Sequence, residues 1–336
     1  MSLLSKIPKW NLGLIIVLLL EIMIFGLINP RFWNISILLN SFNDFIGIAV
    51  IGFFVTLVMI TGGIDISGGS IIGLTSVVIG ILSQVIGINM WISIILAIAA
   101  AGLCGLLNGI LIAYGRVQAM VVTLGGMLLY SGIAIVLVGV SGVSAYEGIS
   151  GFPESFSYLA YGTVWGIPSS IILFIALFII AYVLLHVTKY GRYLFLTGIN
   201  QDAADYAGIN TKKIIASTYV LSGMSAGIAG TMLTSYLGSA RADFGAEYLM
   251  SILTVVVLGG TLITGGKGGI IGTALASIIV GFLQVGMQMG GVSTQYIGLA
   301  TGLLLIISVA LLSISSSAKE NMKKLWRPKF TKEGNI

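Results

Sequence analysis

Uncharged apolar runs follow one another along the chain, and they constrain its fold more than any other feature. Residues 119–140 and 168–187, for example, contain no Asp, Glu, Lys or Arg. About 20 consecutive apolar residues let a helix cross the hydrocarbon core of a bilayer, whereas the strands of a membrane barrel alternate apolar and polar residues. With 57% hydrophobic and 8% charged residues, the 336-residue chain is predicted to be an all-α integral membrane protein.

The apolar runs are bounded by polar, Gly or Pro residues and predict about ten transmembrane helices, some of them broken by Gly-rich segments. Lys6 and Lys9 precede the first run as in a secretory signal, but Glu21 lies within the run and no small-residue cleavage site follows it. We therefore expect the first helix to be retained. The predicted spans are residues 12–28, 43–61, 69–87, 91–113, 119–140, 168–187, 214–236, 248–264, 269–288 and 295–315.

The distribution of Lys and Arg predicts the orientation of these helices. If the N-terminus is cytoplasmic, 14 of the 16 basic residues fall on the cytoplasmic side, and Arg31 and Arg241 fall outside. This asymmetry follows the positive-inside rule for an even number of spans with both termini in the cytoplasm. The basic cytoplasmic tail, residues 316–336, is expected to contact anionic membrane lipid. We expect no nucleic-acid partner, because the net charge of +5 is spread over membrane-facing loops.

Patterns typical of catalytic or metal sites are incomplete. The chain has one cysteine, Cys104, and one histidine, His186, so we expect neither a metal site nor a disulfide. Residues 264–269, Thr-Gly-Gly-Lys-Gly-Gly, lack the spacing of a phosphate-binding loop, because Thr261 stands where its first glycine belongs and Gly268 follows the lysine. We therefore expect no enzyme activity, no bound cofactor and no ATP site in this chain.

The 46 glycines allow two interpretations, close helix packing or broken helices that line a cavity. Gly223 to Gly227 satisfies G-x-S-x-G within an apolar run, and we interpret it, like Gly105 to Gly109, as helix packing. Two other clusters, residues 61–70 and 258–269, are each followed by a similar helix, and such paired interruptions indicate a transport site. The residues assigned to a translocation pathway are Gly63, Asp65, Ser67, Gly260 and Thr261.

Four charged positions have two interpretations each. Asp65 is costly if it faces lipid, so it should face protein, water or a partner; alternatively, it caps the helix that follows it. Glu147, Arg241 and Asp243 fall in predicted outer loops, where we expect them to contact an extracytoplasmic binding protein or its ligand. The alternative for these three is that they are solvated loop charges.

A polar stretch from Thr197 to Lys213 lies within a predicted cytoplasmic loop of residues 188–213. Acidic residues near the start of a helix favour its dipole, and small residues side by side let a partner approach closely. We therefore expect a short helix here that docks into a groove of another protein; the alternative is a solvated connector between two spans. The residues of this surface are Gly198, Asp202, Ala203, Ala204, Asp205 and Gly208.

Three motifs together resemble a known family. They are Gly-Gly-Ile-Asp-Ile-Ser-Gly-Gly-Ser at 62–70, Gly-Ile-Asn-Gln-Asp-Ala-Ala-Asp-Tyr-Ala-Gly-Ile-Asn at 198–210, and Val-Val-Leu-Gly-Gly-Thr with a later Gly-Gly-Lys-Gly at 256–268. In this order and spacing they resemble the ribose-type permeases of bacterial ABC importers over almost the whole chain. Two departures are Ile199, where the commoner pattern has glycine, and Gly68, where many relatives carry a larger residue.

Further segments resemble one branch of that family, the permeases of autoinducer-2 importers. These segments are Tyr146 to Pro153, Ser235 to Gly245 and Gln284 to Gly291. The resemblance implies a single permease domain over residues 1–336, in the bacterial cytoplasmic membrane. The coupling segment of the family maps here onto Gly198, Asn200, Ala203, Ala204, Gly208 and Ile209.

The resemblance also implies partners: an ATPase subunit that binds the ATP, a second permease that is a different chain, and an extracytoplasmic solute-binding protein. The expected solute is small, polar and sugar-like, either autoinducer-2 or, alternatively, ribose, rhamnose or another monosaccharide. A second alternative is an ion-coupled secondary transporter, which normally uses intramembrane acidic or His residues; only Glu21 and Asp65 qualify. The third is a membrane enzyme, for which the chain lacks a suitable cluster of residues.

Overall fold

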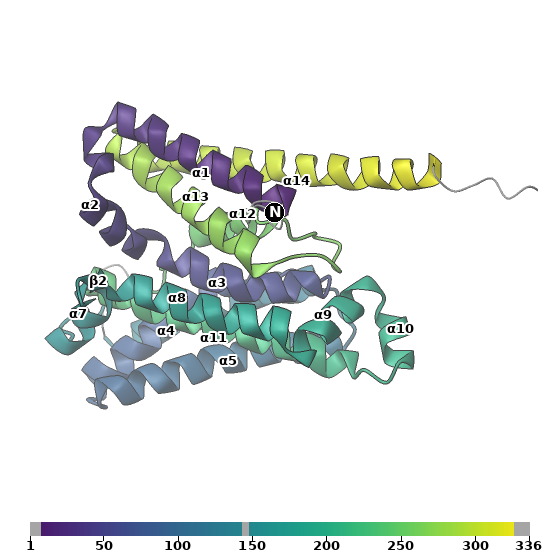
Figure 1. Ribbon diagram of the computed structural model, residues 1–336. Helices are drawn as coiled ribbons and strands as arrows, with labels where there is room; N and C mark the ends of the chain where they lie inside the picture. The colour runs from purple at the N-terminus through teal and green to yellow at the C-terminus, as the bar shows by residue number, and fades with distance from the viewer. Residues whose placement is uncertain (1–7, 143–147, 326–336) are drawn as a thin grey trace, which may run out of the picture.

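A bundle of long helices makes up the computed structural model of the chain (Figure 1), which describes residues 8–142 and 148–325. The elements of the first half are α1 (Lys9–Ile28), η2 (Pro30–Trp33), α2 (Ile35–Asn40), α3 (Phe42–Ile60), α4 (Gly68–Gly80), η3 (Ile81–Val85), α5 (Met90–Ala113) and α6 (Ala119–Val140). Those of the second half are α7 (Glu154–Tyr161), β1 (Thr163–Val164), β2 (Ile167–Pro168), α8 (Ser169–Tyr182), η4 (Val183–Val187), α9 (Lys189–Ile199), α10 (Gln201–Tyr206), α11 (Thr211–Leu237), α12 (Tyr248–Leu258), α13 (Ile270–Met289) and α14 (Thr294–Leu325).

The predicted all-α membrane fold is confirmed. Within the described residues, nine helices are long and apolar enough to cross a membrane. The span predicted at 248–264 is wrong in its length, because α12 ends at Leu258 and has 11 residues. At about 1.5 Å per residue it reaches about 16 Å, roughly half of a hydrocarbon core of about 30 Å. At this point the chain therefore has an irregular segment followed by a helix that is long enough for only about half of the membrane.

The helices pack around α3, which is buried along nearly its whole length. Figure 1 shows α1, α13 and α14 on one side of α3 and α4, α5 and α11 on the other. The outermost helices α1 and α14 expose most of their apolar side chains, as expected of helices that face lipid. The fold thus places α3 and the loop that follows it at the centre of the molecule.

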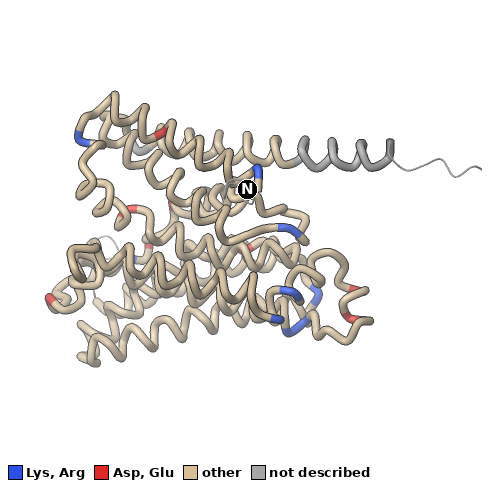
Figure 2. Tube along the Cα trace, viewed as in Figure 1, with Lys and Arg blue, Asp and Glu red and all other residues tan. Residues whose placement is uncertain are grey.

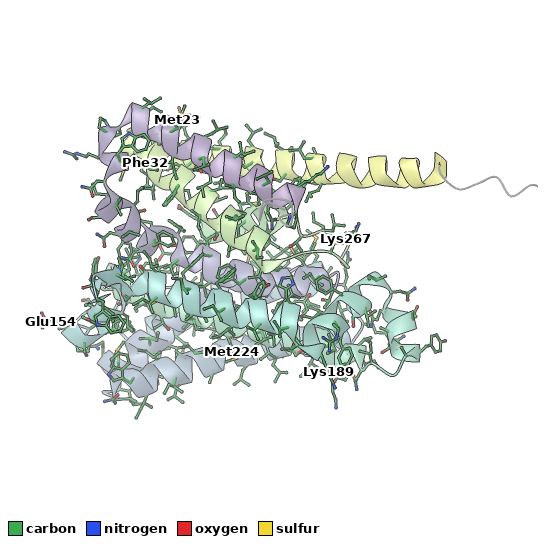
Figure 3. The ribbon with its side chains drawn as sticks, viewed as in Figure 1. Met23, Phe32, Glu154, Lys189, Met224 and Lys267 are labelled. Atoms are coloured by element: carbon green, nitrogen blue, oxygen red, sulfur yellow. The ribbon has the colours of Figure 1, made fainter. Side chains whose placement is uncertain are left out.

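The two ends of the bundle differ in their charged residues. Figure 2 shows most Lys and Arg residues at the end where the described chain begins, and Figure 3 shows Lys189 and Lys267 there and Glu154 at the opposite end. The structure agrees with the expected asymmetry of charge along the bundle. The assignment of the basic end to the cytoplasm stays a prediction from the positive-inside rule.

The contact between α5 and α11 is built from small residues, as predicted. A Cβ on Gly109 would lie 2.7 Å from the carbonyl oxygen of Ala216, and a Cβ on Gly223 would lie 3.0 Å from the amide nitrogen of Gly105. Without side chains at these positions, the two backbones approach closely and gain van der Waals contact that lipid cannot supply. The G-x-S-x-G pattern at 223–227 is therefore a packing motif.

Replacing Gly105 with Ala tests this packing. The new Cβ would lie 2.9 Å from the carbonyl carbon of Tyr219 and 3.1 Å from Cα of Val220, so α5 and α11 must separate. We expect a loss of about 1 to 3 kcal/mol, measured as a lower unfolding temperature of the purified protein in detergent. Gly125→Ala is the control, since nothing lies within 4 Å of its Cβ. Equal unfolding temperatures for the two variants would contradict the packing.

Candidate functional site

The predicted cytoplasmic loop is folded into the two short helices α9 and α10. Asn200 ends α9 and begins α10, where its side-chain oxygen accepts a hydrogen bond of 2.9 Å from the amide of Ala203. Asp205 accepts hydrogen bonds from the amide and the hydroxyl of Thr211, which holds α10 against the start of α11. Gly208, with a φ of 83°, turns the chain between these helices, so Asn200, Asp205 and Gly208 have local structural roles.

The exposed side of α10 differs in one respect from the expected flat alanine face. Asp202 and Ala203 are exposed, whereas Ala204 is 4% exposed and packs inward. Adjacent helical residues point about 100° apart, so two consecutive alanines do not share one face of a short packed helix. Large exposed apolar side chains complete the surface instead, namely Tyr206, which is 91% exposed, and Ile199. The signal for Ile199 was its departure from the usual glycine; nothing in the sequence pattern indicated Tyr206.

The end of α9 packs directly against the end of α3 and against the glycine-rich loop of residues 259–269. A Cβ on Gly198 would lie 2.8 Å from the amide nitrogen of Gly266 and 2.9 Å from the carbonyl carbon of Ile60. The amide of Gly266 in turn donates a 2.9 Å hydrogen bond to the carbonyl oxygen of Ile60. The end of α3, the end of α9 and the loop of residues 259–269 therefore meet in close backbone contact at Gly198.

A second contact ties α9 to the membrane bundle. Tyr190 shares a 2.7 Å hydrogen bond with Ser217 on α11. Burial raises the pKa of the Tyr190 phenol above its ordinary value, so the group is protonated at neutral pH. Movement of α9 would thus be passed to both α3 and α11.

The loop of residues 61–67 is held by a buried polar network centred on Asp65. One carboxylate oxygen accepts hydrogen bonds from the amide and hydroxyl of Ser67, at 3.0 and 2.7 Å, and the other accepts from Ser222 on α11 at 2.7 Å. Asn108 on α5 donates to the Ser67 hydroxyl at 2.9 Å, and Tyr130 on α6 donates to Asn108 at 2.8 Å. The network thus joins the loop to α5, α6 and α11.

The residues expected to line a pathway are not gathered at one cavity. Asp65 and Ser67 are buried and bonded to protein groups, which favours the capping and anchoring alternative. Thr261 is also buried. Gly63 lies in a groove beside α10, and Gly260, with a φ of 91°, contacts Trp10 at a separate hollow. Ile66, Gly69 and Ser70, which are close to Asp65 and Ser67 in the sequence, line a large cavity, whereas Asp65 and Ser67 themselves do not.

Residues 238–247, which include Arg241 and Asp243, form an irregular segment that packs within the bundle. The segment runs along α4: a Cβ on Gly80 would lie 2.8 Å from Cβ of Ala240, and the amide of Arg241 donates a 3.2 Å hydrogen bond to the Ser76 hydroxyl. Ser76 is nine residues before the end of the span Gly68–Val85, or about 14 Å below it. Glycines on α4 leave the space for this second backbone, which the local sequence of residues 238–247 does not reveal.

Arg241 and Asp243 form a two-point ion pair within this segment. The two nitrogen–oxygen distances are 2.9 and 2.6 Å, and the side chains are 36% and 60% exposed in the isolated chain. A charged pair at this depth is unfavourable against lipid, so it requires water or another protein chain. Their expected role as a binding-protein contact stays untested. Glu147, assigned the same role, lies outside the described residues.

A cavity of about 670 Å³ lies between α4, α6 and the irregular segment. It is bordered by the start of α4, by the middle of α6 and by the residues that lead into α12. Its wall is mostly apolar, and Ser70, Ser131 and Asp243 are its polar side chains. The residues on its wall include Ser70, Met127, Ser131, Ile135, Asp243 and Phe244.

Replacing Ser222 with Ala tests the Asp65 network. The change removes a hydrogen bond to a buried carboxyl group, for which we expect a loss of about 1.5 to 3 kcal/mol in stability. The unfolding temperature in detergent is the measurement. Ser225→Ala is the matched control, because the buried Ser225 hydroxyl donates within α11 to the carbonyl oxygen of Ser222. If Ser222→Ala is no more destabilising than the control, the network does not hold the loop.

Comparisons with known proteins bear on this arrangement. Residues 35–309 match the family described as branched-chain amino acid transport system / permease component. The autoinducer 2 import system permease protein LsrD of Yersinia enterocolitica is 45% identical over 306 residues, which are 91% of this chain and 92% of that protein. The Klebsiella pneumoniae protein of the same name is 42% identical over 323 residues, which are 96% of this chain and 97% of that protein. The LsrD protein of Escherichia coli is 43% identical over 306 residues, 91% of this chain and 92% of that protein.

These matches confirm the resemblance to importer permeases that the three ordered motifs indicated. They also agree with a multi-pass protein of the cytoplasmic membrane, since the described residues carry nine helices of membrane-spanning length. No solved structure matches the chain. Because the family match covers most of the chain and the relatives are similar over nine-tenths of it, the chain belongs to the family of branched-chain amino acid transport system permease components.

Proposed function

We propose that this chain is the transmembrane permease subunit of a bacterial ABC importer that carries autoinducer-2, or a related small sugar-like solute, across the cytoplasmic membrane. The observation that carries the proposal is the identity of 42 to 45% with autoinducer 2 import permeases over at least nine-tenths of the chain. The motifs at 146–153, 235–245 and 284–291 support the same solute class. A related monosaccharide permease is the competing outcome of the transport test below.

The exposed surface of α9 and α10 is the proposed docking site for the ATPase subunit. Asp202, Ala203 and Tyr206 project from the basic end of the bundle, away from the membrane helices. A small residue between a carboxylate and an exposed aromatic ring suits insertion into a groove of a partner, where the ring adds buried area. ATP is bound and hydrolysed in that partner, and this chain contributes no catalytic group.

The packing behind this surface supports a mechanical role. Gly198 contacts both Ile60 and Gly266, so a displacement of α9 and α10 acts on the loops of residues 61–67 and 259–269 together. Packed interfaces of this kind respond by switching between discrete arrangements. ATP binding and hydrolysis in the partner would then bias two packings of the bundle that open the pathway to opposite sides.

The other proposed partners are a second permease, which is a different chain, and an extracytoplasmic solute-binding protein. The exposed Arg241–Asp243 pair supports a second chain or an aqueous space on the α4 and α6 side of the bundle, because lipid would not solvate it. The basic tail, residues 316–336, is proposed to lie against anionic lipid at the cytoplasmic surface.

Replacing Ala203 with Arg tests the docking surface. The exposed position accepts the larger side chain without disturbing the fold, while the guanidinium blocks close approach of a groove. We expect ATP-driven uptake to fall by at least about tenfold, which corresponds to about 1.4 kcal/mol of lost coupling, with unchanged membrane abundance. Gln118→Arg, an exposed site at the same end of the bundle, is the control. Full uptake by the Ala203→Arg variant would contradict the assignment of this surface as the docking site.

Partner capture and competition uptake test the importer and its solute. Affinity purification from cells that co-express the neighbouring genes should yield a nucleotide-binding protein and a second permease. The reconstituted complex should take up autoinducer-2 in preference to ribose and rhamnose. Recovery of neither partner would overturn the importer proposal, and preference for a monosaccharide would overturn the solute assignment alone.

A further inference from the structure

We infer that the cavity between α4, α6 and residues 238–247 is the solute-binding station of the pathway, and that it takes a small, uncharged, polyhydroxylated solute. The inference rests on the proposed transport function and adds its binding site. The volume of the cavity, about 670 Å³, lies in the range typical of small-molecule sites.

The position of the cavity is compatible with water inside it. Residues 238–247 are non-helical where they pass Ser76 and Gly73 of α4, well inside the span Gly68–Val85. Irregular backbone at membrane depth is stable only when it is buried in protein or borders a water-filled space. Asp243 is 60% exposed and lies on the cavity wall, where lipid would not solvate its charge, and we place water in the space that it faces.

The side chains suit a sugar-like solute. Asp243 offers carboxylate oxygens that accept hydrogen bonds from hydroxyl groups, and the paired Arg241 fixes their orientation. Phe244 packs beneath the Arg241 guanidinium, at 5.9 Å, and presents an apolar surface for the C–H faces of a solute. Ser70 and Ser131 add hydroxyls from the two helices opposite. The ion pair is neutral as a whole, which favours an uncharged solute over an anion or a cation.

Continuity with the docking surface distinguishes this cavity from the others. Ile66 on its wall lies between Asp65 and Ser67 of the network, and Gly69 follows two residues after Ser67. The loop that holds them begins at the end of α3, where α9 packs. A different cavity, between α12, α13 and α14, is lined by Asp44 and Gln284. The wall of this second cavity also carries Glu247, Gln288 and Gln295, but no residue of the loop at 61–67 and none of the Asp65 network. It therefore serves as the comparison site.

Single-cysteine labelling tests access to the cavity. The background is Cys104→Ala, since Cys104 is the one native cysteine, and the probe is a charged, membrane-impermeant methanethiosulfonate. In the complete complex, we expect Ser131→Cys to react rapidly, because thiolates form in water. Leu103→Cys, at nearly the same distance from the basic end of its helix and 64% exposed on the apolar outside, should not react. Autoinducer-2 at about ten times its dissociation constant should slow labelling at Ser131 about tenfold.

A Ser131→Cys variant that is unreactive, or reactive but not protected by solute, would overturn the inference. Labelling and protection do not require turnover, so their failure is separable from failure of the transport function. If protection is seen without ATP-driven uptake, the site stands and the importer proposal falls. If uptake occurs without protection, the reverse holds.

Uptake by charge-removing variants gives a second test. Asp243→Asn should reduce autoinducer-2 uptake by about tenfold or more at unchanged membrane abundance and unchanged ATPase binding, as expected when a hydrogen bond to a charged group is weakened. Asp44→Asn makes the same chemical change in the comparison cavity and should leave uptake within about twofold. The opposite result, with Asp44→Asn impaired and Asp243→Asn active, would move the site to the other cavity and refute the inference.

Discussion

Backbone amides and carbonyls inside a bilayer have no water to bond with, so each break in a membrane helix must find partners within the protein. The chain meets this constraint in three places, at residues 61–67, 238–247 and 259–269. In the first segment, the amide of Ser67 donates a hydrogen bond to Asp65. In the second, the amide of Arg241 donates to the Ser76 hydroxyl, and in the third, the amide of Gly266 donates to the Ile60 carbonyl. Each break is therefore tied to the surrounding bundle by hydrogen bonds.

These breaks also connect the two ends of the proposed mechanism. The surface of α9 and α10 rests on the ends of α3 and of the loop at 259–269, and the loop after α3 leads through Asp65 to the cavity beside α4. Rigid helices alone would move as units, whereas a tightly packed loop passes a displacement to its neighbours. The same hydrogen bonds that stabilise the irregular backbone thus place the cavity one packed loop away from the docking surface.

Much of the fold follows from residue type and spacing. Nine spans were predicted within a few residues, because about 20 apolar residues in sequence have few alternatives to a membrane helix. The packing role of Gly105, Gly109 and Gly223 was also predictable from their spacing. The site was less predictable: Asp65 was correctly singled out as an internal charge, but its partners Ser222 and Asn108 are distant in sequence, and no local pattern marks them.

The sequence by itself determined that the chain is a helical membrane protein and where its spans lie, because these depend on local hydrophobicity and charge. Only the tertiary structure decided that Ala204 points inward, that α12 is a half-helix, and that the segment with Arg241 and Asp243 packs beside α4. The physical reason is steric and long-range: glycines near residue 73 leave room for a backbone that is about 170 residues later in the chain.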